Sequence, residues 1–113
     1  MNDLEETILA TMREVFSSSE SIITYRSGSS VVQLPAVKAP SSPERTGEEG
    51  RYLTGWGLRF IVWRKDLPEL PRLGDQLTDA EDRTYAVSVF QGKPHYEYSD
   101  PYEHTVTIYV KRI

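Results

Sequence analysis

The sequence predicts a mainly β fold, a small antiparallel β-barrel or sandwich of six to seven strands with an N-terminal α-helix. Three observations support this fold class. Apolar side chains repeat at helical spacing near the start of the chain, most later segments alternate in polarity, and most links between those segments are as short as hairpin turns. Such links favour an antiparallel barrel or sandwich over any βαβ arrangement.

Length, charge and cysteine content limit the functions to consider. The chain has 113 residues, a net charge of −4 and no cysteine. We expect a single domain, and the lack of cysteine excludes disulfides, cysteine–zinc sites and thiol chemistry. No apolar run approaches the ~18 residues that span a bilayer, and acidic side chains stand where a signal peptide is basic. We therefore expect no membrane contact and a location in the cytoplasm of the cell that makes the protein.

A helix is predicted within residues 1–17, capped by Asn2 or Asp3 and ended by the serines at 17–19. Its apolar side chains form a stripe along one side: Leu4, Ile8, Leu9, Met12, Val15 and Phe16. We expect the stripe to pack mainly on the protein's own core. Its members Leu4, Ile8 and Met12 are also candidates for contacts with another subunit.

A strand pair is predicted over residues 21–38, with strands at 21–26 and 30–34 and an extension at 36–38. The turn between them contains Gly28, which can take a positive φ. A flexible loop is expected at residues 39–50 (Ala39 to Gly50), because the segment has no large apolar side chain; an idle surface loop is the alternative to a functional one. The candidate residues in this loop are Pro40, Ser41, Ser42, Pro43, Glu44, Arg45, Glu48 and Glu49.

A β-rich body is predicted over residues 51–113. Residues 58–63 carry apolar or aromatic bulk on both faces, which indicates a strand between two layers or one covered by a partner. Prolines make residues 66–71 a loop, and Gly74-Asp75 supplies a turn whose carboxylate can accept backbone N–H groups. A short strand from Gln76 then pairs with a strand at 83–90 as a hairpin.

The end of the chain predicts a further pair of strands. Residues 95–98 and 104–110 alternate around a turn at 99–101. In the second of these strands Thr105 shares one face with Tyr109, and the aliphatic side chains share the other.

Residues with catalytic or ligand-binding chemistry are sparse. His95 and His104 are expected on strand surfaces, since a metal pair would need added carboxylates. The acidic hairpin tip at residues 79–82 lacks the glycine and the terminal glutamate of an EF-hand loop, so solubility explains it better. Gly55-Trp56-Gly57 is too short for a dinucleotide fingerprint, and no serine lies in a nucleophile motif. We expect no catalytic residue, no metal and no cofactor, and hence no enzyme.

The aromatic side chains permit an alternative function, an OB-like β-barrel that binds single-stranded nucleic acid or a small partner. The rings in question are Trp56, Phe60, Trp63, Tyr85, Phe90, Tyr96, Tyr98, Tyr102 and Tyr109. A stacking platform also needs interleaved cations, and Arg59 and Lys93 are few among many carboxylates. The rings are therefore expected in the core and in subunit contacts.

Short motifs from Ser21 to the C-terminus resemble those of the small head-tail joining proteins of tailed bacteriophages and prophages, the head closure or head completion proteins. The matching segments are Ile23-Thr24-Tyr25-Arg26-Ser27-Gly28, Arg59-Phe60-Ile61-Val62, Asp66-Leu67-Pro68, Gly74-Asp75, Tyr85-Ala86-Val87 and Tyr109-Val110-Lys111.

This resemblance implies a small barrel with an appended helix that assembles as a homo-oligomeric ring beneath the portal. The partners would be portal or adaptor proteins and tail proteins, while DNA passes through without specific binding. The loop from Ala39 to Gly50 would project into or across the channel. Glu44, Glu48 and Glu49 suit an acidic lumen that does not grip DNA, whereas Arg45 departs from it. The protein would move from the host cytoplasm into the virion.

Overall fold

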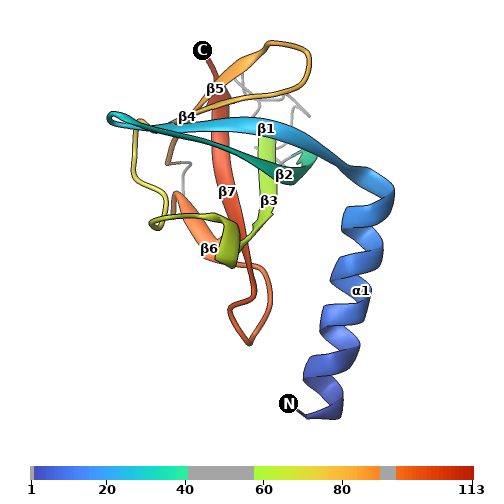
Figure 1. The fold of residues 1–113 in the computed structure, drawn as a ribbon. Helices are drawn as coiled ribbons and strands as arrows, with labels where there is room; N and C mark the ends of the chain where they lie inside the picture. Colours follow the sequence, from blue (N-terminus) through green and yellow to red (C-terminus); the bar gives the residue numbers. More distant parts are fainter. Residues whose placement is uncertain (1, 41–57, 90–93) are drawn as a thin grey trace, which may run out of the picture.

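The computed structural model describes residues 2–40, 58–89 and 94–113 (Figure 1). Its elements, in chain order, are α1 (Asp3–Ser19), β1 (Glu20–Ser27), β2 (Ser30–Pro40), β3 (Leu58–Trp63), the 3₁₀ helix η2 (Arg64–Asp66), β4 (Gln76–Thr78), β5 (Thr84–Val87), β6 (Tyr96–Tyr98) and β7 (Thr105–Arg112). The predicted mainly β fold with an N-terminal helix is confirmed.

Six strands close an antiparallel barrel in the order β1-β2-β3-β7-β5-β4, with β4 pairing back onto β1. The strand β7 holds the barrel together, because β3 pairs with its residues Thr105–Val110 along one edge. On the other edge β5 pairs with Val110–Arg112 and the extra strand β6 with Val106–Ile108. The barrel alternative of the predicted fold is therefore correct, with one strand added outside it.

The core fills the barrel with aliphatic and aromatic side chains from the closing strands. Phe60 of β3 and Tyr85 of β5 meet edge to face with ring centroids 5.5 Å apart. Both rings are buried, as are Val62 and Ile108 beside them. Each fully buried side chain of this size contributes roughly 1.5–3 kcal/mol, so the barrel is the main source of stability.

The strand β3 is covered on both faces, as its sequence predicts. Phe60 and Val62 face the barrel interior, and Trp63 on the outer face stacks on Phe16 of α1 with ring centroids 4.8 Å apart. The N-terminal helix thus covers Trp63 at the end of β3, while most of its packing is on β2 and β1.

The helix is longer than predicted, because the serines at 17–19 lie inside it. The hydroxyls of Ser17 and Ser18 each donate to the carbonyl oxygen of Glu14 at 3.1 Å. Both hydroxyls therefore have a hydrogen-bond partner within the last turn of the helix. At the other end the Asn2 side chain accepts the Glu5 N–H at 2.7 Å, which confirms the predicted cap.

The strand β2 runs through Pro35 to Pro40, so the expected loop start at Ala39 is wrong. Pairing with β3 begins only at Ala36, so Pro35 has no partner strand on the outer edge of β2. Its missing N–H therefore costs no hydrogen bond on that side. The two-residue turn before β2 contains Gly28 at φ 60°, as expected.

The turns around β4 depend on two buried aspartates. Asp75 accepts the Arg72 N–H at 2.9 Å, as predicted, and also the hydroxyls of Tyr25 at 2.5 Å and Ser27 at 2.9 Å. It therefore ties the turn at Gly74, where φ is 90°, to the β1–β2 hairpin. Burial and then the bond to Asp75 raise the pKa of Tyr25 well above its usual range, so the phenol stays protonated as the donor.

The hairpin β4–β5 is confirmed, but it is shorter than predicted because β5 ends at Val87. Its acidic tip is more than a solubility feature. Asp79 is buried, and its carboxylate accepts the N–H groups of Glu81 and Arg83, both at 2.9 Å. Asp82 takes a positive φ of 68° to complete the turn.

Candidate functional site

The N-terminal helix is the element least integrated with the barrel. Figure 1 shows α1 extending away from the strands, with the N-terminus at its far end. Only Leu9 and Phe16 are buried along it, and its packing partners are β2 and, to a lesser extent, β1. A helix held by so few side chains can present its remaining surface to another molecule.

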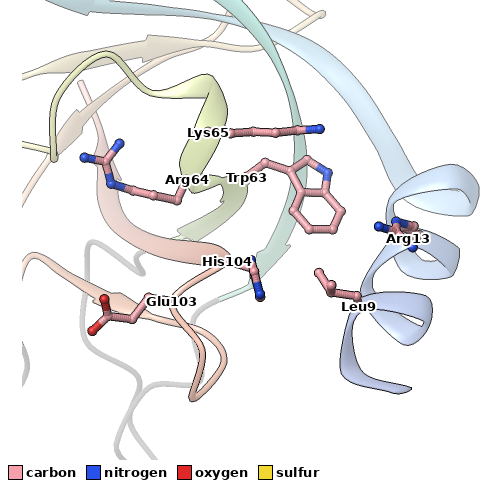
Figure 2. A pocket seen from close by; sticks show the side chains of 7 residues that line it. All are labelled: Leu9, Arg13, Trp63, Arg64, Lys65, Glu103 and His104. Carbon is pink, nitrogen blue, oxygen red and sulfur yellow. The ribbon is translucent and has the colours of Figure 1, made fainter. Parts of the chain in front are cut away.

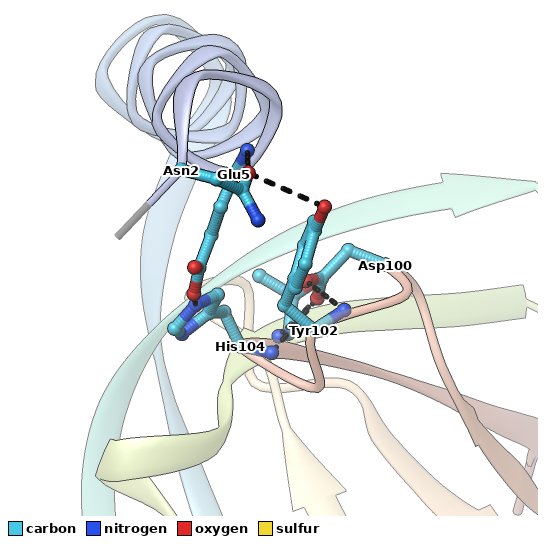
Figure 3. Close-up of polar contacts among 6 residues, drawn as sticks. Asn2, Glu5, Asp100, Tyr102 and His104 are labelled. Carbon is cyan, nitrogen blue, oxygen red and sulfur yellow. Dashed lines mark hydrogen bonds and ion pairs between the residues drawn. The ribbon is translucent and has the colours of Figure 1, made fainter.

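The start of α1 is held by the turn before β7 (Figure 3). Glu5 reaches down from the helix, and its Oε2 lies 2.7 Å from Nε2 of His104. Next to this pair the Tyr102 hydroxyl donates to Oδ1 of Asn2 at 3.5 Å, a long hydrogen bond. Residues nearly a hundred positions apart in the chain therefore fix where the helix begins.

Asp100 shapes the turn that carries these contacts. Its carboxylate accepts the N–H groups of Tyr102 at 3.1 Å, His104 at 2.9 Å and Thr105 at 2.8 Å, and Glu103 takes a φ of 64°. Burial alone would raise the pKa of Asp100, but these hydrogen bonds outweigh it and lower the pKa. The geometry repeats that of the Asp79 turn: an aspartate, then a positive φ three residues later.

A cleft of about 550 Å³ opens between α1 and the barrel. It is lined by Leu9 and Arg13 from the helix and by Trp63, Arg64, Lys65, Glu103 and His104 from the barrel. Figure 2 shows Arg13 and Lys65 on either side of the Trp63 indole, whereas Arg64 and Glu103 point away from the helix. The side chains facing the cleft thus combine an apolar floor with two cations, and no local pattern in the sequence indicates that these residues meet.

The apolar stripe predicted on the helix divides into two parts. Leu9 and Phe16 face the barrel, while Ile8 and Met12 are half-buried and Leu4 is 61% exposed. The three candidates for subunit contacts therefore lie on the part of the stripe that the barrel does not fully cover.

The loop candidates fall mostly outside the described residues. Of the eight, Ser41, Ser42, Pro43, Glu44, Arg45, Glu48 and Glu49 are not described. The backbone of Pro40 ends β2 and pairs with Leu58 at the start of β3. The connection over residues 41–57 therefore leaves and re-enters the barrel at neighbouring positions on two paired strands.

An ion pair between an exposed lysine and a buried aspartate lies close to the base of that connection. Nζ of Lys38, two residues before the end of β2, is 3.0 Å from Oδ2 of Asp79, which also accepts the Tyr85 hydroxyl at 3.1 Å. Burial would raise the pKa of Asp79, but backbone hydrogen bonds and Lys38 lower it to about 2. Sequence inspection missed this pair, since nothing in the chain signals that residues 38 and 79 approach each other.

The histidines were expected on strand surfaces, and this is wrong. His95 precedes β6 and His104 precedes β7, and both are half-buried with a partner: Nε2 of His95 lies 3.0 Å from the Pro71 carbonyl oxygen, and His104 contacts Glu5. Among residues 2–40, 58–89 and 94–113, no group of three or more histidine, aspartate or glutamate side chains is placed to hold a metal ion.

Most of the described aromatic rings are unavailable for base stacking. Phe60, Tyr85 and Tyr109 are buried, and Trp63 is stacked on Phe16. Burial and the hydrogen bond that its hydroxyl donates to Glu97 raise the pKa of Tyr109 to about 12. Trp56 and Phe90 lie outside the described residues. Tyr96 and Tyr98 are half-buried against the core, and Tyr102 is half-buried near His104. Few rings on the described barrel surface are therefore free for the stacking that single-stranded nucleic acid requires.

Within the described part of the chain, no helix is both long and apolar enough to cross a membrane.

Two comparisons with known proteins bear on the family of this chain. A search of curated proteins gave no match. A family model described as phage head-tail joining protein matches residues 1–113. Because the match extends over the whole sequence, the chain belongs to the phage head-tail joining protein family, structural proteins of the virion at the interface between head and tail.

Proposed function

We propose that this protein is the subunit of a homo-oligomeric ring beneath the portal, where it connects portal or adaptor proteins to tail proteins. The observation that carries the proposal is the helix α1, which extends from a closed barrel and is only partly covered by it. Strand pairing closes the barrel except along the outer edges of β1 before Thr24 and of β2 before Ala36, and the appended helix is a further natural site for subunit contacts.

The uncovered part of the helix has the chemistry of an interface. Leu4 is 61% exposed and Val15 36%, and both lie in the same stripe as the half-buried Ile8 and Met12. Exposed apolar side chains lined up along one helix face are typical of surfaces that bind another protein. Contacts through Leu4, Ile8 and Met12 become strong when a ring closes, even if each is weak in a free subunit.

The segment from Ala39 to Gly50 is proposed to lie at the DNA channel. Support comes from its anchorage: β2 pairs with β3 up to Pro40 and Leu58, and β3 pairs with β7 from Leu58 to Trp63. The residues that flank this connection, Pro40 and Leu58, therefore lie side by side on paired strands. Its glutamates Glu44, Glu48 and Glu49 would repel a passing phosphate backbone, and the net charge of −4 has the same sign.

The subunit would be present in the host cytoplasm before it joins the virion. Its partners would be recognised by protein surfaces alone, with DNA in contact with the ring but not specifically bound. This division of roles follows from an acidic chain that has an apolar helix face.

The test is to incubate the purified protein with portal rings, or with portal rings that carry an adaptor, and to look for a new layer by electron microscopy. We expect a ring-shaped layer that Leu4→Asp with Ile8→Asp prevents. The matched control is Leu73→Asp, because Leu73 is 58% exposed but lies in the loop between η2 and β4. No added layer at any salt concentration overturns the proposal.

A further inference from the structure

The cleft beside α1 presents two cations over an apolar floor. Arg13 on the helix and Lys65 after β3 are both exposed and flank the Trp63 indole (Figure 2). Nζ of Lys65 lies 5.9 Å from the indole centroid, and within the described residues neither cation is in an ion pair with a carboxylate. Their positive charges are therefore available to an acidic group that enters the cleft.

The floor of the cleft is fixed by packing inside the molecule. Leu9 is 6% exposed, and the Trp63 ring is held against Phe16. A rigid apolar floor beside two cations suits an apolar side chain that has carboxylates close to it. Such a site favours a partner that has both an apolar group and carboxylates, since an apolar group alone leaves the cations unpaired.

The first turn of α1 has this composition. Asp3, Leu4 and Glu6 are exposed, while Glu5 turns inward to His104. At three positions apart, Asp3 and Glu6 are neighbours on the helix surface, on the same side of Leu4. The Asn2 cap keeps this turn helical, and Leu4 is the most exposed apolar side chain on the helix, at 61%. Figure 1 shows this turn at the end of α1 farthest from β1. Asn2 and Glu5 hold it to the turn before β7 and leave Asp3, Leu4 and Glu6 exposed.

We propose that the first turn of α1 in one subunit docks into the cleft beside α1 of the next subunit. Leu4 would lie on Leu9 and Trp63, with Asp3 and Glu6 paired to Arg13 and Lys65. The two surfaces differ, so the contact is head to tail and repeats from subunit to subunit until a ring closes. This inference rests on the proposed ring and names the surfaces that form it.

Nucleic acid fits the cleft less well than a second copy of the chain. Two cations neutralise too few phosphates for firm binding, and the indole already stacks on Phe16, where a base would need to lie. Binding of a nucleic acid here is a contrary outcome of the test.

A cysteine-free chain allows a clean test by disulfide trapping. A Leu4→Cys variant and a size-tagged Lys65→Cys variant are mixed and oxidised, and the mixed dimer is measured by non-reducing electrophoresis. We expect it to form about tenfold faster than the mixed dimer of Leu4→Cys with Leu73→Cys, because docking raises the effective concentration of the first pair. Added salt should remove most of this advantage. Equal rates for the two pairs overturn the inference.

Charge reversal gives an independent test by sedimentation velocity. Arg13→Glu with Lys65→Glu should weaken the self-association of the protein, as should Asp3→Lys with Glu6→Lys, and the chain with all four changes should recover it. Circular dichroism checks that α1 remains helical, and Asp3→Asn with Glu6→Gln replaces the lysine pair if it does not. Failure of the four-change chain to recover association contradicts the contact. If the free wild-type chain is monomeric, the same variants are compared by the layer that they add to portal rings, and failure of the four-change chain to restore that layer contradicts the contact.

The portal experiment separates failure of this contact from failure of the proposed function. If Arg13→Glu with Lys65→Glu still adds a complete layer to portal rings, the ring stands and the cleft contact is wrong. If the wild-type protein adds no layer, the proposed ring itself fails. Tighter retention of single-stranded DNA by wild type than by this variant also overturns the inference, because the cleft would then be a nucleic-acid site.

Discussion

Single carboxylates determine several turns in this barrel. Asp75, Asp79 and Asp100 are buried, and each accepts hydrogen bonds from the backbone of its own turn. A buried carboxylate is costly unless its oxygens are fully bonded, so each turn is held in one conformation. Through the turn that it shapes, Asp100 also positions the two side chains that hold the start of α1, namely Tyr102 and His104.

Replacing Asp79 tests this at the residue scale. The pKa of its carboxyl falls from 3.8 to about 2, so the stability that it contributes is complete above about pH 4 and is lost as the pH falls towards 2. We expect Asp79→Asn to reduce the free energy of unfolding at neutral pH by on the order of 1–2 kcal/mol, allowing for solvent screening. Urea unfolding between pH 2 and 7 should also show that the free energy of unfolding falls less steeply with decreasing pH in the variant than in the wild type.

The control for this change is Asp82→Asn in the same turn. Asp82 is exposed, takes a left-handed φ that asparagine also tolerates, and makes no ion pair among the described residues. A pH dependence that changes equally in both variants would contradict the role given to Asp79.

A second prediction concerns Glu103, which has a φ of 64°. A residue with a Cβ loses roughly 1–2 kcal/mol in this region, whereas glycine enters it freely but loses more chain entropy on folding. We expect Glu103→Gly to raise stability by up to ~1 kcal/mol and Glu103→Ala to give no gain. The midpoint of thermal unfolding, measured for both variants, tests this prediction. A purely electrostatic effect of losing Glu103 would shift the midpoint equally in the two variants, which would contradict it.

At the scale of elements, the helix depends on a small number of contacts. Phe16 is 2% exposed against Trp63, so Phe16→Ala should remove about 3 kcal/mol of docking free energy. Because α1 can detach while the barrel stays closed, we expect hydrogen exchange of the α1 amides to speed up about a hundredfold. The amides of β3 and β7 should exchange as before.

The neighbouring Val15→Ala is the matched control, since Val15 is 36% exposed and off the docked face. It should change exchange in α1 only slightly. Equal acceleration in the barrel strands of Phe16→Ala would show that helix and barrel unfold as one unit, against the picture of a lightly held arm.

Elements with clear local patterns could be predicted, whereas contacts between distant residues could not. Three features depend on residues that are close in the sequence: the alternation of β3, the hairpin of β4 and β5, and the Asn2 cap. All three agree with the structure. The pairs Lys38–Asp79 and Glu5–His104 depend on barrel closure, which no local pattern reports. The cleft was missed for the same reason, because Arg13 and Lys65 approach only after α1 packs on β2 and places Phe16 against Trp63.

At the scale of the whole molecule, the net charge and the burial of the described aromatic rings argue against tight nucleic-acid binding. The net charge is −4, and the described aromatic rings mostly lie in the core or under α1. Affinity for nucleic acid depends on released counterions and, for single strands, on free rings for stacking. In the proposed ring, neither counterion release nor ring stacking would be an advantage, since adhesion to DNA would slow its passage through the channel.

We therefore expect no retention of single-stranded or duplex DNA on the immobilised protein at physiological salt, and only traces at low salt. Trp63→Ala should leave this result unchanged, since its indole serves to dock α1; the change should instead lower stability by about 3 kcal/mol or detach the helix. Salt-sensitive retention of single strands that Trp63→Ala abolishes, in a variant whose barrel remains folded by circular dichroism, would favour the OB-like binding module instead.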